Sequence, residues 1–211
     1  MGIVLKETFN DDCLLGIWEI KEDYDTLLSN LNLEEEEYIK LNGFKSEGRK
    51  REWLSVRNLI NILLERDARI IYNSDNKPFL KGTTYNISIS HSYNLTAIFL
   101  SKTKRVGIDL EKMSHKIVKL SDKFVNNQEM IITEPELKRY HLYIHWCAKE
   151  ALYKICDKQD INFKENLTIF PFQPTDEGLI KGRVLNSYGL EDFRLNYIKY
   201  KNYSIVWTCK Q

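Results

Sequence analysis

The chain has 211 residues, which is enough for one large domain or two compact halves with a substantial core. Its 31 basic and 30 acidic residues leave a formal net charge of +1, so no overall basic field marks the chain as a nucleic-acid binder. Hydrophobic residues make up 43% and charged residues 29%, which is the balance of an ordinary globular protein.

The cysteines exclude two classes of protein. No C-x-x-C pair occurs among Cys13, Cys147, Cys156 and Cys209, which argues against a zinc cluster and against a disulfide framework. The N-terminal "MGIVLKETFN" has no apolar core after a basic start, and no apolar run approaches the roughly 20 residues of a membrane span. We therefore expect a cytoplasmic protein with reduced thiols.

The first half of the chain mixes strand and helix signals. Residues 13–20 predict a strand, and the acid-rich residues 32–44 predict a short helix. Ser46 is expected to cap a longer helix over residues 47–65 with an apolar stripe. Residues 72–80 predict a turn, and residues 85–90 and 95–101 predict two strands joined by a turn.

The second half begins with a further predicted strand, "RVGIDLE" at residues 105–111. A helix is expected over residues 116–124, with Ile117, Leu120 and Phe124 on its apolar side. Pro135 opens or flanks another helix, which carries "HWCAKEALYK" at residues 145–154, and strands are expected from about residue 167. These signals predict an α+β fold with halves at residues 1–103 and 104–211.

Three carboxylates form the first candidate site. Strand alternation places Asp109 and Glu111 on one face, where two neighbouring carboxylates repel each other and a hard cation relieves the repulsion. Glu150 in the later helix offers a third carboxylate for Mg²⁺. The plainer alternatives are a charged strand edge and a solvated helix face with a Glu150–Lys154 pair.

Phosphate-binding residues form the second candidate site. His91 lies between two serines at a strand end, and the small hydroxyl residues around it suit phosphate oxygens. The predicted long helix begins with several arginines, whose planar guanidinium groups suit phosphate, and Lys77-Pro78 follows a turn. A solvated helix face explains the arginines equally simply.

The order and spacing of these segments carry more information than any one of them. "NISISHS", "GIDLE" and "WCAKEALYK" follow one another at residues 86–92, 107–111 and 146–154. Together they resemble the 4′-phosphopantetheinyl transferases of the larger, surfactin-synthetase-activating type. In that family an Asn-x-Ser-x-Ser-His-Ser segment precedes Gly-(Val/Ile)-Asp-(Ile/Leu)-Glu and Trp-(Thr/Ser/Cys)-x-Lys-Glu-Ala-x-x-Lys.

The resemblance implies a role for each matching residue. Asp109, Glu111 and Glu150 would hold Mg²⁺ on the pyrophosphate of coenzyme A. The phosphates and adenosine would be bound by a second group, which comprises Arg49, Arg57, Lys77, Pro78, Ser90, His91, Lys149 and Lys154. Among the catalytic residues, beside Glu150, Lys154 and His91, Glu129 would take the proton from the acceptor serine.

The sequence departs from the family pattern at two places. Asn76 stands before Lys77-Pro78 where the family commonly has Gly, and Asn tolerates a positive φ better than most residues do. In the basic helix Arg49, Arg51 and Arg57 compete for the 3′-phosphate. The family register favours Arg49 and then Arg57.

The implied reaction transfers phosphopantetheine from coenzyme A to a serine of an apo acyl or peptidyl carrier protein, with adenosine 3′,5′-bisphosphate as by-product. The implied fold has two similar α/β halves about a pseudo-twofold with the site in the cleft between them, in a monomer. The carrier's acidic helix would meet Lys116, Lys119 and Lys123. Fatty-acid, polyketide and peptide-synthetase carriers all remain open as partners.

Two rival functions stay open. A metal-dependent nuclease is suggested by the acid–acid–base cluster of Asp109, Glu111 and Lys112, although the near-zero net charge argues against it. A protein that binds coenzyme A or a carrier without catalysis is the other rival.

Overall fold

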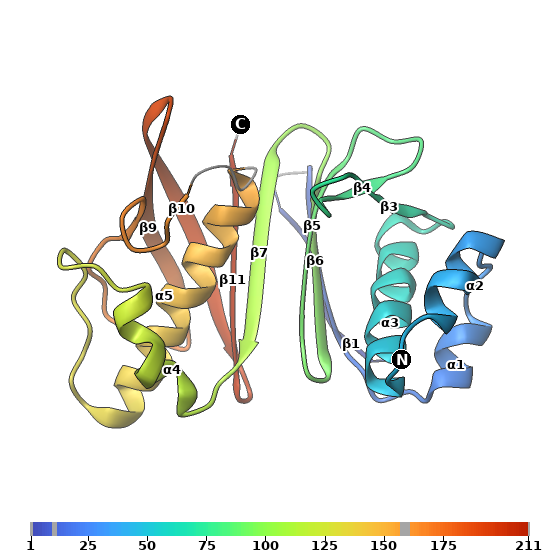
Figure 1. The fold of residues 1–211 in the computed structure, drawn as a ribbon, viewed down its shortest axis with the longest axis horizontal. Coiled ribbons are helices and arrows are strands. Elements are labelled where there is room, and N and C mark those ends of the chain that lie inside the picture. The colour runs from blue at the N-terminus through green and yellow to red at the C-terminus, as the bar shows by residue number, and fades with distance from the viewer. Residues whose placement is uncertain (1, 10–11, 157–160, 211) are drawn as a thin grey trace. The chain divides into compact units, whose positions relative to one another are not determined.

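The computed structural model describes residues 2–9, 12–156 and 161–210. The chain forms two compact units, Met1–Thr103 and Lys104–Gln211, each with its own hydrophobic core. The elements follow one another as shown in Figure 1. The predicted α+β class is confirmed, since each unit packs helices on an antiparallel sheet.

The first unit consists of residues up to Thr103. Its strands are β1 (Ile3–Phe9), β2 (Cys13–Glu19), β3 (Ile70–Tyr72), β4 (Pro78–Leu80), β5 (Asn86–Ser92) and β6 (Leu95–Ser101). Its helices are α1 (Tyr24–Ser29), α2 (Glu35–Asn42) and α3 (Glu47–Leu64). The main sheet has the antiparallel order β1-β2-β6-β5, and β3 and β4 form a separate hairpin.

Helix α3 forms the centre of the first unit and begins where the sequence predicted. The Ser46 side chain accepts a hydrogen bond from the backbone N–H of Arg49, 3.2 Å away, which satisfies one of the open donors of the first turn. Its apolar stripe is buried against β2 and β6, and α1 packs on the helix as well (Figure 1). The basic first turn of α3 is thereby fixed relative to the sheet.

The second unit consists of residues from Lys104 onward. It contains β7 (Arg105–Lys112), α4 (Lys116–Leu120), the 3₁₀ turn η1 (Ser121–Lys123), α5 (Pro135–Ile155), β8 (Leu167–Ile169), β9 (Glu177–Asn186), β10 (Gly189–Tyr200) and β11 (Tyr203–Lys210). The sheet has the antiparallel order β7-β11-β10-β9-β8. Helix α5 packs against β7 and β11 (Figure 1).

The two units share the connection of three strands and one long helix. In each, the strand before the long helix pairs with the last strand of the unit, and that last strand pairs with the strand before it. The set is β2, α3, β5 and β6 in the first unit and β7, α5, β10 and β11 in the second. This shared order supports the expected likeness of the two halves.

The segment of α4 and η1 differs from the helix expected over residues 116–124. Ile117 and Phe124 are buried as predicted, but Leu120 is 40% exposed, so the prediction for Leu120 is wrong. The α-helix ends at Leu120 and continues as a 3₁₀ turn. The expected single helix is thus a short α-helix followed by one 3₁₀ turn, and Leu120 lies where the two meet.

Gly107 in β7 allows a close approach between strand and helix in the second unit. A Cβ atom added at Gly107 would lie 2.1 Å from the carbonyl oxygen of Ala151 in α5. Real carbon and oxygen atoms do not approach so closely, so no residue with a side chain fits without moving α5. The packing of α5 against β7 therefore explains why "GIDLE" begins with glycine.

We expect Gly107→Ala to lower the free energy of unfolding by about 2 kcal/mol or more, because the helix backbone has to retreat from the strand. The matched control is Gly48→Ala in α3, where a Cβ meets no atom within 4 Å and alanine favours the helix. Urea unfolding of both variants checks this. A Gly107→Ala protein as stable as the wild type would show that α5 does not need the close approach.

Candidate active site

Asp109 and Glu111 lie on the face of β7 that α5 covers. Gly107 faces Ala151 of α5, and strand alternation puts Asp109 and Glu111 on the same face. Asp109 is buried and Glu111 is half-buried, so the carboxylates run from the interior toward the edge of the helix. Lys112 is the next residue, and alternation turns it to the opposite face, away from the nuclease-like cluster considered above.

One face of α5 supplies the partners of these carboxylates. Lys154 Nζ donates to Asp109 Oδ1 at 2.7 Å and to the carbonyl oxygen of Ile108 at 2.8 Å. The buried thiol of Cys147, about two turns earlier on the helix, lies beside Asp109, and burial raises the pKa of this thiol well above its ordinary value. Glu150 is half-buried on the same stretch of helix. The strand and helix motifs are thus brought together.

Lys149 and Glu129 form a second ion pair, inside the second unit. Both side chains are 0% exposed, and Lys149 Nζ lies 2.9 Å from Glu129 Oε2. The other Glu129 oxygen accepts from the backbone N–H of Ile169 at 2.8 Å, and Asn126 N–H donates to Oε2 at 2.8 Å. Although burial raises the pKa of Glu129, His145 and the charge of Lys149 outweigh it and hold that pKa below its ordinary value.

Arg49 and His91 come together in the first unit, as a shared phosphate site requires. Arg49 Nη1 lies 2.7 Å from His91 Nε2 and donates to Glu52 Oε2 at 2.9 Å. The same Glu52 oxygen lies 3.6 Å from His91 Nδ1. Arg49 projects from the first turn of α3 and His91 from β5, and Ser90, buried, precedes His91 in that strand.

Arg57 lies apart from this group. Its side chain is buried, donates to Glu37 Oε1 at 2.9 Å and stacks on the Trp53 ring with 3.1 Å between its Cζ atom and the ring centroid. A guanidinium enclosed in this way supports the fold of the first unit. Of Arg49 and Arg57, it is therefore Arg49 that lies beside His91.

Lys77 and Pro78 lie at the turn of the β3–β4 hairpin, which packs beside β5. Asn76 adopts φ = 59°, the left-handed conformation that its family position implies, and Asn73 Oδ1 accepts from the Lys77 N–H at 2.8 Å. Asn76 therefore adopts the positive φ for which glycine is commonly used.

Residues 105–208 match the family described as the 4′-phosphopantetheinyl transferase superfamily. This similarity covers nearly the whole of the second unit. The chain is also similar to the 4′-phosphopantetheinyl transferase AcpT of Salmonella typhi, at 28% identity over 116 residues, which is 50% of this chain and 58% of that relative. The match thus spans little more than half of the length of AcpT.

Three carboxylates of the second unit suit a hard cation by their chemistry. Asp109, Glu111 and Glu150 offer only carboxylate oxygens, the donor type that Mg²⁺ prefers. Within residues 2–9, 12–156 and 161–210, no three His, Cys, Asp or Glu side chains converge as a metal centre, and Lys154 holds Asp109 instead. The metal set accordingly stays a prediction, and a cation at Asp109 would share that carboxylate with Lys154.

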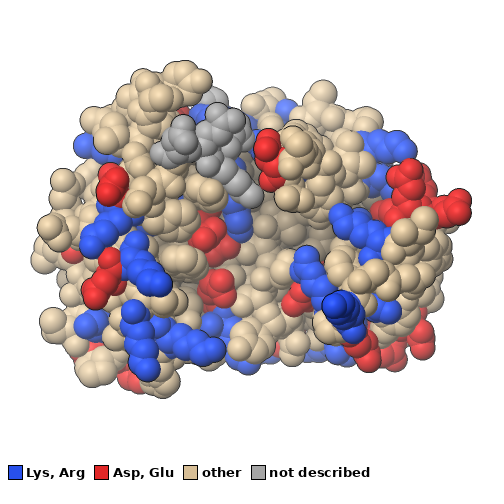
Figure 2. Space-filling model, viewed as in Figure 1, with Lys and Arg blue, Asp and Glu red and all other residues tan. Residues whose placement is uncertain are grey.

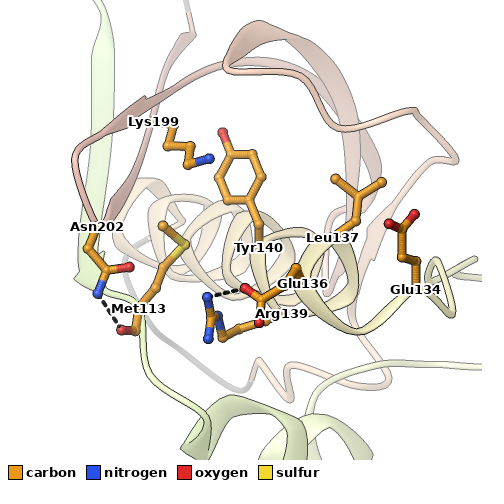
Figure 3. A pocket seen from close by; sticks show the side chains of 8 residues that line it. All are labelled: Met113, Glu134, Glu136, Leu137, Arg139, Tyr140, Lys199 and Asn202. Atoms are coloured by element: carbon orange, nitrogen blue, oxygen red, sulfur yellow. Dashed lines mark hydrogen bonds and ion pairs between the residues drawn. The ribbon is translucent and has the colours of Figure 1, made fainter.

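A pocket of about 400 Å³ lies at the other end of α5 (Figure 3). Its described lining residues, none of which is a predicted site residue, are Met113, Glu134, Glu136, Leu137, Arg139, Tyr140, Lys199 and Asn202. Several of its polar groups pair with each other or the backbone, as Asn202 Nδ2 does with the carbonyl oxygen of Met113.

No described helix is long and apolar enough to cross a membrane.

Sequence reasoning missed three residues that contact the predicted ones. Cys147 lies beside Asp109, Glu52 accepts a hydrogen bond from Arg49, and His145 lies 3.6 Å from Glu129. The available signal was helical spacing. His145 precedes Lys149 by four residues, and Glu52 follows Arg49 by three, so both pairs share a helix face.

His141 makes the second unit sensitive to acid. The ring is buried against Phe172 and His145, and burial, with the neighbouring His145, lowers its pKa from 6.5 to about 4. The folded protein keeps this ring neutral while the unfolded chain takes up a proton near pH 6.5. Stability is therefore complete above pH 6.5 and declines as the pH falls toward 4, by up to about 3 kcal/mol.

We expect His141→Phe to flatten this decline, although the variant is less stable at pH 7 because the Ile132 N–H loses its acceptor. Urea unfolding at several pH values between 7 and 4 checks the prediction. The exposed His115, changed to Gln, is the control. An equal acid slope in the His141→Phe variant and the wild type would contradict it.

Proposed function

We propose that the chain transfers 4′-phosphopantetheine from coenzyme A to a serine hydroxyl of an apo carrier protein and releases adenosine 3′,5′-bisphosphate. The observation that best supports this proposal is the hydrogen bond from Lys154 of α5 to Asp109 of β7. It joins the helix segment and the strand segment that resemble the superfamily's motifs. The match to a phosphopantetheinyl transferase superfamily supports the reaction type.

Residues of the first unit would bind the nucleotide end of coenzyme A. Arg49 Nη1 already donates to His91 Nε2 at 2.7 Å, so the other N–H groups of Arg49 would donate to a 3′-phosphate beside His91. Glu52 holds both groups in its absence, and its charge would have to be displaced or shared. Ser90, Lys77 and Pro78 would line the phosphates and the adenine side.

Residues of the second unit would bind the pyrophosphate. Asp109, Glu111 and Glu150 would hold Mg²⁺, which when bound neutralises the pyrophosphate and stabilises the leaving phosphate. Lys154 is positioned by two hydrogen bonds and would place its charge near the same oxygens. The Lys154 side chain is partly exposed and its ammonium group has a third N–H donor. It would therefore donate to a ligand while both hydrogen bonds to β7 remain.

The serine proton needs an acceptor, and Glu129 was the expected one. Its side chain is 0% exposed and three donors already engage it. A general base must lie within hydrogen-bond reach of the proton it takes. The geometry therefore favours a structural role for Glu129.

Intact-protein mass spectrometry of an apo carrier with this protein, coenzyme A and Mg²⁺ tests the proposal. We expect a gain of one phosphopantetheine, lost with EDTA and reduced at least about 100-fold by Asp109→Ala. The matched control is the exposed Asp25→Ala, which leaves the reaction unchanged. If coenzyme A binds without transfer to any fatty-acid, polyketide or peptide-synthetase carrier, the rival binding protein replaces the proposed enzyme.

The exposed face of Lys116, Lys119 and Lys123 would meet the acidic helix of the carrier. Figure 2 shows Lys and Arg side chains on the part of the second unit where α4 lies. Opposite charges of this kind speed association more than they tighten the complex. The lysines would therefore steer the carrier toward the site.

Charge reversal of all three lysines to Glu is expected to raise KM for the carrier several-fold and to flatten its salt dependence, with kcat nearly unchanged. Steady-state kinetics at several salt concentrations measures this. Reversal of the exposed Lys21, Lys181 and Lys201 is the control for net charge. Equal effects of both triple variants would dismiss the face as a docking surface.

A further inference from the structure

Lys149 is enclosed beside Glu150, a residue of the proposed metal site. Its Nζ atom donates to the carbonyl oxygen of Phe124, to Glu129 Oε2 at 2.9 Å and to the carbonyl oxygen of Phe163 at 2.9 Å. An ammonium group has three N–H donors, so all of them are used within the unit. Lys149 thus has no donor left for a phosphate of coenzyme A.

Glu129 extends the same network to the sheet. It bonds the backbone of Asn126 in the loop after η1 and the backbone of Ile169 in β8. His145, one turn before Lys149, lies with Nδ1 3.6 Å from Glu129 Oε1. The three side chains therefore tie one side of α5 to segments on either side of it in the sequence.

The opposite side of α5 is held by different contacts. An α-helix turns 100° per residue, so Ala151 points about 200° away from Lys149, and Glu150 lies between them. The backbone of Ala151 touches Gly107, and Lys154 bonds Asp109. Two sets of contacts on opposite sides leave the helix little freedom to rotate about its axis.

We propose that Lys149, Glu129 and His145 form a positioning cluster that fixes the rotation of α5 and so aims Glu150 along β7 toward Asp109 and Glu111. The inference rests on the proposed function for what Glu150 does. It assigns Lys149 and Glu129 no contact with substrate, in place of the ligand and general-base roles expected from the sequence.

A double-mutant cycle separates these roles. Lys149→Met and Glu129→Gln each leave one buried charge without its partner, whereas the double variant has neither charge. The measurements are Mn²⁺ affinity by electron paramagnetic resonance, coenzyme A affinity by calorimetry, thermal unfolding, and kcat and KM for transfer. Lys181→Met, at an exposed position of β9, is the matched control.

The positioning role predicts that each single variant unfolds at a lower temperature and binds Mn²⁺ at least about tenfold more weakly. The double variant is expected to recover Mn²⁺ affinity to within about threefold of the wild type, and kcat with it. If the single variants do not fold, the comparison of the double variant with the wild type decides the question.

Three results would overturn the inference. Glu129→Gln and the double variant could both lose kcat while binding Mn²⁺ normally, as a general base predicts. Coenzyme A affinity could fall in every variant that lacks Lys149, as a phosphate ligand predicts. The double variant could also stay as weak for Mn²⁺ as the singles. A wild type that binds Mn²⁺ but transfers nothing would sink the proposed function alone.

Discussion

The contact between the backbone of Ala151 and the glycine of β7 is the constraint on which the site depends. A side chain at Gly107 would push α5 away from the sheet. Lys154 would then lose Asp109, since a 2.7 Å hydrogen bond tolerates little displacement. The same approach brings Cys147 to Asp109 from the previous turns of the helix. One missing side chain therefore determines whether the two signature segments meet.

Adjacent residues of α5 have different environments for a simple geometric reason. Lys149 faces the interior of the second unit and Glu150 remains half-buried, since successive residues point 100° apart. A buried charge is tolerated only with a partner and satisfied hydrogen bonds, and Glu129 with two carbonyl oxygens provides both. The "KE" of the motif thus combines a buried ion pair with a carboxylate that a ligand can reach.

Local signals predicted much of this structure and long-range ones did not. Ser46 capped α3 and Pro135 opened α5, because both effects act within one helical turn. Strand β1 and the β3–β4 hairpin were not predicted, since their pairing depends on partners elsewhere in the chain. The enclosure of Glu129 and Arg57 was also hidden. The sequence does not show which partner buries a charged residue. Here Lys149 pairs with Glu129, and Glu37 pairs with Arg57.

The boundary between Thr103 and Lys104 has a consequence for how the chain folds. Each sheet is completed by strands from one continuous stretch of sequence, so neither unit needs a strand from the other. The first unit can therefore fold on the ribosome while the second is still being synthesised. Its β5 and α3 would already present Arg49 and His91 side by side before "GIDLE" is translated.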